Sequence, residues 1–410
     1  MSAKLDAGSA VRPVPMSRIM SRTRIREVRL RHYRAFSNVR WSIDRVTFLV
    51  GRNGAGKSTL MDALGFISES LTDSISTALE RRGNLEGIRR REAGKGRRHD
   101  VSLSVVLELD GASFLYGFRI GSDAARSSYT IKEEHLVGPS QSPGFARDRQ
   151  SLTSEVEGMM PVPDPETLIF PLIAGTSSTW KSLHDALRGV SLHQFSPQAI
   201  RGEPIIGKED RLDRDGGNAG DVLKQTQINL RDRAWIEERL GAVTPGIRSV
   251  RATARAGRRV IIFQQTGEGG RTNNFDVSMM SDGTARSLGV LLALRQTPRP
   301  SIVLLDEIED SLHPFAQSVL LDAIEAASEE FPVVVSTHSP ETLSHPAAKP
   351  ERVRIVQWSD GASQLYHVDS KTREFCKPPQ TVGRLLRSNA LWTEERSSTM
   401  ESDASFFKVP

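Results

Sequence analysis

The chain has 410 residues, a net charge of +5, and 38% hydrophobic and 26% charged residues, as is typical of a soluble globular protein with a large core. No apolar run approaches the roughly 20 residues that a membrane-spanning helix needs, so we expect no membrane segment. The single cysteine, Cys376, excludes an internal disulfide and a zinc site built from cysteines. The first residues lack the apolar stretch of a secretion signal, and we expect a cytoplasmic protein.

The charge is unevenly distributed along the chain. Residues 1–100 contain 21 Lys/Arg and 10 Asp/Glu, a net charge of +11, which leaves 34 against 40, or −6, for the remainder. The densest basic run lies at 88–100. We interpret it as a solvated loop, with contact to nucleic acid or an acidic partner as the alternative.

The pattern of residues predicts five segments in chain order. Residues 1–24 are expected to be a disordered basic tail. Residues 25–137 have strand character on both sides of a phosphate loop and predict an N-terminal lobe. Residues 138–250 predict a loop rich in Ser, Pro and Gly followed by a helical insertion, residues 251–370 a C-terminal lobe, and residues 371–410 a short helix and a tail.

The C-terminal half carries the clearer pattern. "IRSVRATARAGRRVIIFQQT", from 247 to 266, predicts a hairpin, and from 281 the order helix, strand, helix, strand predicts a parallel α/β core. "TVGRLLRSNALW", at 381–392, predicts an amphipathic helix. Its apolar residues form either a docking element or a face that folds back on the body; they are Leu385, Leu386, Leu391 and Trp392. We expect 395–410 to be loose.

The strongest motif is "FLVGRNGAGKSTLMDAL". A strand-like run ends at Gly51, the pattern G-x-x-x-x-G-K-[ST] follows, and a helix begins directly after it. Glycines allow backbone N–H groups to wrap phosphates, Lys57 reaches the β- and γ-phosphates, and the Ser58 hydroxyl is a Mg²⁺ ligand. The predicted contacts to ATP in this loop are Asn53, Gly54, Ala55, Gly56, Lys57, Ser58 and Thr59.

Two later strands end in chemically active side chains. "SIVLLDE" ends in Asp306, predicted to hold Mg²⁺, and Glu307, predicted to polarise the attacking water. "PVVVSTHS" ends near His338, which is predicted to donate to the γ-phosphate; a purely structural histidine is the alternative. Since parallel strands end at one sheet edge, we expect these residues to meet the phosphate loop.

A third polar cluster, "SDGT", begins a helix of high apolar content at 281–284. Ser281 is a good N-cap, and Gly283 leaves the first turn without a side chain. The stretch is either an ordinary capped core helix or a helix end left open for an anion.

The order of these elements resembles the ABC-type ATPases of the SMC, RecF and OLD branch. The residues that carry the resemblance are "LRHYRAF", "GRNGAGKS", "MSDGTARSLGVLLAL", "DEIEDSLHP" and "STHSP". "FSPQAIR" and "LDRDGGNAGDVL" are further similar to small bacterial predicted ATPases of the AAA family that stand beside a second gene in settings associated with phage defence. The resemblance spans about residues 25–392.

The resemblance implies an α/β fold: a P-loop NTPase core of ABC/RecF-like type with an antiparallel β subdomain and a helical insertion. It also implies ATP and Mg²⁺ as cofactors. In that family the stretch "SDGT" is the signature motif, which implies that Ser281 and the N–H of Gly283 contact ATP bound to the other subunit of a homodimer or higher oligomer. Ile308 stands where the family usually has Pro, and Asp306 where many members have Glu. The family's glutamine loop cannot be placed; Gln194 and Gln198 are candidates.

Missing features narrow the function. No sustained heptads lie between the phosphate loop and "SDGT", which excludes a long SMC-type coiled coil. No strand after His338 carries an acidic pair, so no nuclease is evident in the same chain. Three readings remain: an ATP-driven switch that controls a separately encoded nuclease or toxin, a RecF-like DNA-binding repair ATPase, and a transporter ATPase. The last is disfavoured because its signature would carry Gly-Gly-Gln.

Overall fold

The computed structural model describes residues 23–91, 99–122, 129–139, 143–148, 151–154, 164–207, 211–377, 379–388, 390–391 and 406–409. The expected tail, apart from its last two residues, and most of the basic run therefore lie outside the described residues, as does Trp392. β1 begins at Arg24.

A six-stranded sheet forms the centre of the molecule, in the order β16-β15-β3-β14-β13-β9. All neighbouring strands in it are parallel except β16, which returns antiparallel to β15. Its strands are β3 (Val46–Val50), β9 (Val190–His193), β13 (Ile302–Leu305), β14 (Val333–Thr337), β15 (Val353–Ser359) and β16 (Ala362–His367). This sheet confirms the predicted parallel core.

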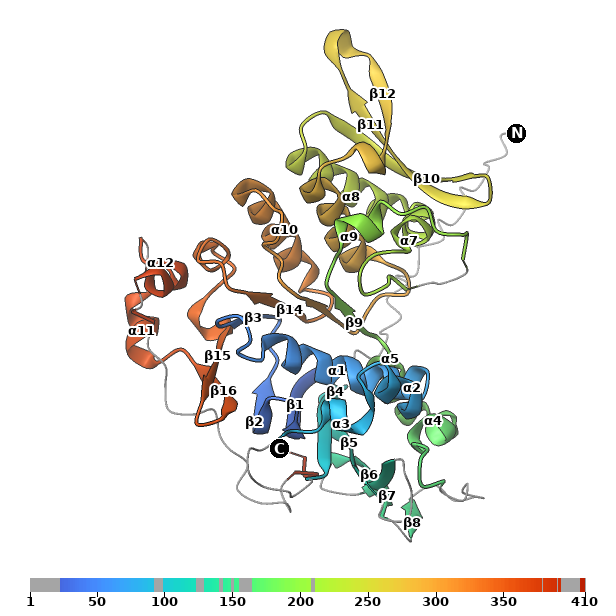
Figure 1. The fold of residues 1–410 in the computed structure, drawn as a ribbon, viewed down its shortest axis with the longest axis vertical. Coiled ribbons are helices and arrows are strands. Elements are labelled where there is room, and N and C mark those ends of the chain that lie inside the picture. Colours follow the sequence, from blue (N-terminus) through green and yellow to red (C-terminus); the bar gives the residue numbers. More distant parts are fainter. Residues whose placement is uncertain are drawn as a thin grey trace, which may run out of the picture.

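Both faces of this sheet are buried, and they face different cores. In β13, Ile302 and Leu304 belong to the core shared with α1, whereas Val303 and Leu305 belong to the core shared with α9 and α10. The near-continuous apolar runs of β3, β13 and β14 follow from this double burial. Helices therefore cover both sides of the sheet (Figure 1).

The helices follow one another in groups of two or three along most of the chain and alternate singly with strands from α9 to β14. They are α1 (Lys57–Thr72), α2 (Ile75–Glu80), α3 (Asn84–Ile88), α4 (Phe170–Ile173), α5 (Ser178–Arg188), α6 (Pro197–Ile200), α7 (Ala219–Thr226), α8 (Leu230–Val243), α9 (Asp282–Arg295), α10 (Pro314–Ala327), α11 (Ser370–Phe375) and α12 (Val382–Arg387). Short 3₁₀ turns lie between them, including η4 (Val277–Met279) and η5 (Thr342–Ser344).

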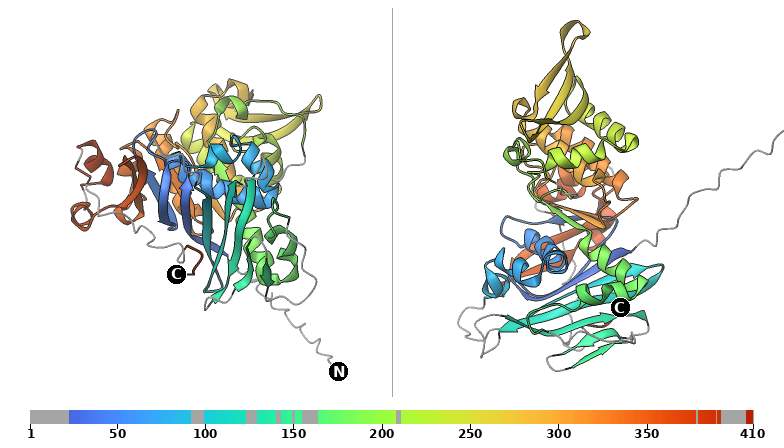
Figure 2. Two further views of the ribbon diagram at one scale, coloured as in Figure 1. Left: turned by 60° about the horizontal axis from the view of Figure 1, so that its bottom comes forward. Right: turned by 90° about the vertical axis from the view of Figure 1, so that its right-hand side faces the viewer.

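A seven-stranded antiparallel sheet lies on the other side of α1, as the right-hand view of Figure 2 shows. Its order is β2-β1-β4-β5-β6-β7-β8. The strands are β1 (Arg24–Tyr33), β2 (Phe36–Ser42), β4 (Val101–Leu109), β5 (Ala112–Ser122), β6 (Tyr129–Val137), β7 (Pro143–Arg147) and β8 (Leu152–Ser154). The strands expected up to residue 137 are confirmed, and β7 and β8 extend the sheet into the segment expected to be a loop.

A third sheet packs on α7 and α8 and forms the far end of the molecule (Figure 1). The expected hairpin is β10 (Ile247–Arg255) with β11 (Arg258–Thr266), and β12 (Thr272–Asp276) adds a third strand. Val250, Ile261 and Phe263 on one face join the core beneath.

Two expectations were wrong. The helical insertion expected within 138–250 contains α4 to α8, but Val190–His193 interrupts these helices and forms β9, the edge strand beside β13. Four residues with partial burial are too few to give a strand signal on their own. The end of the chain was expected to be loose, yet Phe406 is completely buried. Among the described residues, no helix is both long and apolar enough to cross a bilayer.

Candidate nucleotide-binding site

The phosphate loop connects β3 to α1 and has a shape that requires glycine. Gly54 and Gly56 have φ values of 76° and 112°, which residues with a side chain rarely adopt. A Cβ on Gly51 would lie 2.2 Å from the carbonyl oxygen of Val356, so β15 closes against the loop. The Lys57 ammonium donates to the carbonyl oxygens of Gly51 (2.9 Å) and Arg52 (3.3 Å), both in the loop.

The hairpin of β15 and β16 supports this loop from outside. The Ser363 hydroxyl donates to the carbonyl oxygen of Ala55 at 2.6 Å, and both groups are buried. A Cβ on Gly56 would lie 2.7 Å from the Ser363 Oγ. Ser363 therefore fixes the middle of the phosphate loop, a role that nothing in its local sequence indicates.

Three carboxylates act on the charge of Lys57. The side chain is buried, and this burial lowers the pKa of its ammonium, while the charges of Asp306, Glu307 and Glu309 act in the opposite direction. The acidic strand end therefore converges on the lysine of the phosphate loop.

Asp306 directly follows β13 and is buried. Its N–H donates to the carbonyl oxygen of His193 on β9 at 2.8 Å, and its Oδ1 accepts from the Ser336 hydroxyl on β14. The Ser336 Oγ in turn accepts the N–H of Glu307 at 2.9 Å. Neighbouring strands on both sides thus fix the backbone of these two residues, and Ser336 also holds the Asp306 carboxylate.

Glu307 follows in a strained backbone conformation, with φ at 53°. A non-glycine residue with positive φ is uncommon and persists when its surroundings hold it there. Here the bonds from Ser336 and from Arg286, which donates to the Glu307 carbonyl oxygen at 3.2 Å, supply that restraint. The side chain remains partly exposed at the sheet edge.

His338 follows β14 and contacts a third carboxylate. Its backbone N–H and its Nδ1 both contact the Oε1 of Glu309, at 2.7 and 2.8 Å. The imidazole is 45% exposed, so its other nitrogen faces the outside. For Nε2 to donate while Nδ1 donates to Glu309, the ring must carry both protons.

The parallel register explains why these groups meet. β3, β14 and β13 lie side by side, with Thr337 paired to Val50 and Leu305 paired to Val335. Gln194 follows β9, the next strand, and is exposed at the same edge, whereas Gln198 lies beyond it on α6. Of the two glutamine candidates, Gln194 is the one next to the strand that ends in Asp306.

The signature segment caps its own helix. The Ser281 Oγ accepts the N–H of Thr284 at 3.2 Å and lies 2.8 Å from the Thr284 hydroxyl. Arg201 fixes the turn by pairing with Asp282 at 2.6 Å and donating to the carbonyl oxygen of Met280. Ser281 is nevertheless exposed, so capping and contact with an outside ligand are compatible.

The same helix is tied to the acidic loop of its own chain. Arg286 is buried and also lies 3.6 Å from Asp310; burial lowers its pKa, which the surrounding acids oppose. A Cβ on Gly283 would lie 2.9 Å from the carbonyl oxygen of Ser311. A shift of α9 therefore moves the backbone next to Glu307.

Comparison with known proteins identifies the family. Residues 46–160 and 164–344 match the family described as "AAA domain, putative AbiEii toxin, Type IV TA system". The chain belongs to this family of P-loop ATPases. Its core has the fold of SMC heads: an SMC head bound to the C-terminal winged-helix domain of ScpA has a TM-score of 0.51 at 14% identity, over 85% of this chain and 99% of that one.

A curated relative gives a second finding for this AAA-domain ATPase. The retron Ec83 probable ATPase of Escherichia coli is 24% identical over 385 residues, covering 78% of this chain and 69% of the relative. The structural likeness to the SMC head confirms the predicted SMC-like ATPase fold.

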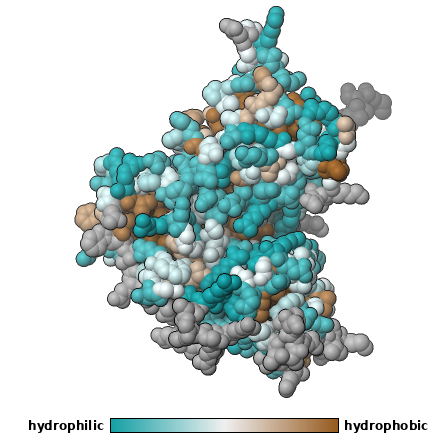
Figure 3. Space-filling view, in the orientation of Figure 1, coloured by the Kyte–Doolittle hydropathy of each residue, from teal (hydrophilic) through white to brown (hydrophobic). Residues whose placement is uncertain are grey.

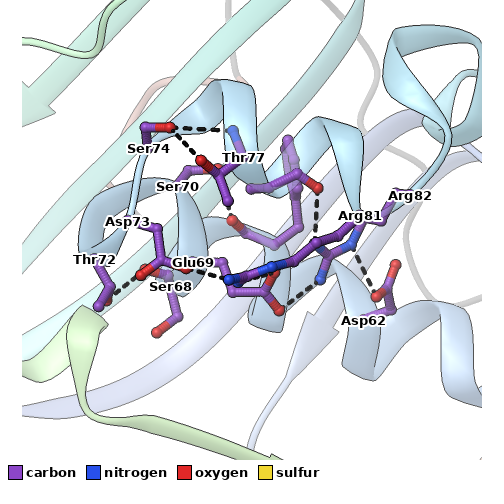
Figure 4. A network of polar contacts seen from close by, with 12 residues as sticks. Asp62, Ser68, Glu69, Ser70, Thr72, Asp73, Ser74, Thr77, Arg81 and Arg82 are labelled. Carbon is purple, nitrogen blue, oxygen red and sulfur yellow. Dashed lines mark hydrogen bonds and ion pairs between the residues drawn. The ribbon is translucent and has the colours of Figure 1, made fainter.

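The "LRHYRAF" motif of this AAA-domain ATPase anchors the helix behind the phosphate loop. The Tyr33 hydroxyl donates to Asp62 on α1 at 2.6 Å, and Arg34 pairs with the same carboxylate at 2.9 Å. Figure 4 shows Arg82 bridging Asp62 and Glu69. Burial would lower the pKa of Arg82, but its hydrogen bond to Glu69 and both acidic charges outweigh burial and raise it.

A cavity of about 1110 Å³ opens next to the phosphate loop. Its walls include Asn53, His338 and Trp358, with Leu386 and Leu391 from the C-terminal segment. Figure 3 shows apolar surface beside α12 on an otherwise largely hydrophilic face. Leu386 and Leu391 pack against the core beneath, so these two residues fold back on the body, as one of the two interpretations predicted.

The residues present fit a magnesium ion. The exposed Ser58 lies in the first turn of α1, and the Oδ2 of Asp306 makes no hydrogen bond within the described residues, so both oxygens are available. The described residues contain no group of three His, Cys, Asp or Glu side chains that could hold a metal alone. Mg²⁺ in such sites takes its remaining ligands from phosphate and water.

Proposed function

We propose that this AAA-domain ATPase binds and hydrolyses ATP and uses it to pair with a second copy of itself, as a switch for a separately encoded effector. The observation that carries the proposal is the shared sheet edge at which the phosphate loop after β3 meets Asp306 and Glu307 after β13, with β14 between the two strands. Family membership supports the ATPase assignment.

We assign roles to both backbone and side-chain groups of the site. The N–H groups from Asn53 to Thr59 cradle the phosphates, and Lys57 leaves its carbonyl partners to bind them. Ser58 and Asp306 would hold Mg²⁺, which would supply positive charge against the phosphates. Glu307 orients water and accepts its proton, and the outward nitrogen of His338 donates to the terminal phosphate.

The signature helix supports a shared site. Ser281 and Gly283 begin α9, which belongs to the lobe of α7 and α8 (Figure 1). An exposed helix start favours an anion because its N–H groups and dipole are positive. We propose that these two residues serve the ATP of the partner copy in an isologous dimer.

Two observations support a role together with a separately encoded effector protein. The curated relative is named a retron ATPase, and the family description names a type IV toxin–antitoxin system. Within the described residues no further acidic cluster suggests a nuclease in this chain. We therefore propose that a separate nuclease or toxin carries out the effect, in bacterial defence against phage.

A DNA-stimulated repair ATPase is the second candidate. It is favoured by exposed arginines on and beside the third sheet, among them Arg248 and Arg251 on β10 and Arg271 directly before β12. Plain duplex DNA would then stimulate ATP hydrolysis, and added salt would weaken that stimulation. A switch would respond to its effector instead.

The experiment that tests the proposal uses Glu307→Gln. The amide keeps the shape of the carboxylate but cannot accept a proton, so the variant should bind ATP, fail to hydrolyse it and accumulate as a dimer. Light scattering should show the mass doubling with ATP·Mg²⁺ and no change with ADP. A mass that ATP leaves unchanged would contradict ATP-driven pairing.

A further inference from the structure

The last described residues, Phe406 to Val409, pack on the antiparallel sheet. The residues that they contact lie far from them in the sequence, as Arg29 does. Phe406 has 0% exposure, and the Arg31 guanidinium lies over its ring at 5.3 Å. A segment this short has no core of its own, so the sheet provides the surroundings that bury it.

The sheet recognises the backbone of this segment through a buried cation. Arg29, on β1, is 2% exposed and donates through Nη1 to the carbonyl oxygens of Phe406 (3.0 Å) and Lys408 (2.7 Å). The Ser104 hydroxyl also contacts the Phe406 carbonyl oxygen at 3.4 Å. A buried guanidinium needs acceptors for its N–H groups, and the tail supplies two of them.

A second subsite receives the next ring. The Phe407 ring lies 4.6 Å from that of His135, and a Cβ on Gly117 would lie 2.9 Å from it. A small apolar cluster completes the subsite; its members are Val106, Leu115, Val137, Phe407 and Val409.

This surface is separate from the nucleotide site. Leu115 of β5 joins the tail cluster, whereas Tyr116 and Phe118 of the same strand face the core that contains α1. Alternate residues of a strand point to opposite faces, so the tail occupies the outer face of the sheet.

We propose that this outer face, formed by β1, β4, β5 and β6, is a peptide-binding groove whose ligand is a Phe-Phe-x-Val segment, and that the chain's own residues 406–409 occupy it. The groove selects two adjacent aromatic rings through Arg31 and His135 and reads the backbone through Arg29. The Lys408 side chain is exposed and makes no contribution to recognition.

The test measures binding of the tail as a separate peptide. A variant ending at residue 400 should bind a fluorescein-labelled peptide of residues 403–410, and fluorescence anisotropy reports the affinity. The full-length chain should bind the same peptide far more weakly because its own tail fills the groove. In the peptide, Phe406→Ala should weaken binding by roughly tenfold or more, whereas Lys408→Ala should leave it unchanged.

Folding of the shortened chain is checked by circular dichroism. If it does not fold, the full-length double variant Phe406→Ala, Phe407→Ala replaces it, because that chain keeps its length and leaves the groove without the two rings. Absence of peptide binding to the folded receptor, or equal binding of the Phe406→Ala peptide, would overturn the proposal.

Discussion

Glu309 accepts two contacts from His338 with a single carboxylate oxygen, one from the backbone N–H at 2.7 Å and one from Nδ1 at 2.8 Å. Its other oxygen is buried and has no hydrogen-bond partner among the described residues. The pair joins the loop after β13 to the loop after β14, and it sets which nitrogen of His338 faces outward.

The first prediction concerns this pair. Glu309→Gln keeps the shape but removes the negative charge beside the imidazole, so His338 should donate less well. We expect turnover to fall about tenfold with ATP affinity nearly unchanged, measured by steady-state hydrolysis and nucleotide titration. Glu329→Gln, on an exposed acid, serves as control. Equal turnover in both variants would count against a role for Glu309.

The second prediction concerns the support of the phosphate loop. Ser363→Ala removes the hydroxyl that donates to the Ala55 carbonyl oxygen, a loss of about 1 kcal/mol. The loop should become less well ordered, and the dissociation constant of ATP should rise severalfold. Ser359→Ala, in the same hairpin, removes only a 3.5 Å contact with Tyr366 and should leave affinity unchanged. Matching affinities for the two variants would argue against this support.

The third prediction tests the close approach of α9 to the acidic loop. Gly283→Ala would place a methyl group 2.9 Å from the Ser311 carbonyl oxygen and displace the backbone near Glu307. Hydrolysis should fall roughly tenfold, because small displacements of catalytic groups are costly. Gly175→Ala, where a Cβ meets open space, should behave like the unmodified chain. Turnover is measured beside the melting temperature, so that loss of fold is recognised.

The fourth prediction is a pH dependence of stability. Burial lowers the pKa of His193 from 6.5 to about 4, although its bond to the Asp213 carbonyl oxygen opposes this. Between these values the unfolded chain takes up a proton and the folded chain does not. This contribution to stability is therefore complete above about pH 6.5 and falls by about 3 kcal/mol as the pH drops toward 4.

His193→Asn should remove that contribution. Its amide N–H can still donate to the Asp213 carbonyl oxygen, but it does not titrate. Urea unfolding at pH 7.5, 6 and 5 should show a smaller loss of stability with acid than in the unmodified chain. An identical slope in both chains would show that another group dominates.

Sequence patterns predicted the residues that stand within one continuous motif. Gly51 to Ser58, Asp306 and His338 each follow an apolar strand, and parallel strands end at one edge. The partners of these residues were not predictable. Ser336 meets Asp306, and Glu309 meets His338, only through the alignment of β13 with β14, which no local pattern specifies.

Short elements and contacts between distant residues could not be predicted either, because local sequence patterns do not specify them. β9 has four residues, too few to distinguish it from the helices around it, although it carries the carbonyl that binds the Asp306 N–H. Ser363 reaches the phosphate loop across more than 300 positions of sequence separation. The aromatic pair at 406–407 was a visible signal within a polar tail, but its partner Arg29 lies at the opposite end of the chain.

Mixing two inactive variants tests most directly whether Ser281 serves the partner's ATP. Lys57→Ala and Ser281→Arg should each be inactive alone, with melting temperatures confirming that both fold despite the lost cap. In a mixed dimer one site combines both defects and the other is intact. Equal mixing gives about half mixed dimers, so activity should recover to about a quarter of that of the unmodified chain. No recovery, with exchange proven by tagged pull-down and ATP bound at the intact site, would contradict the shared site.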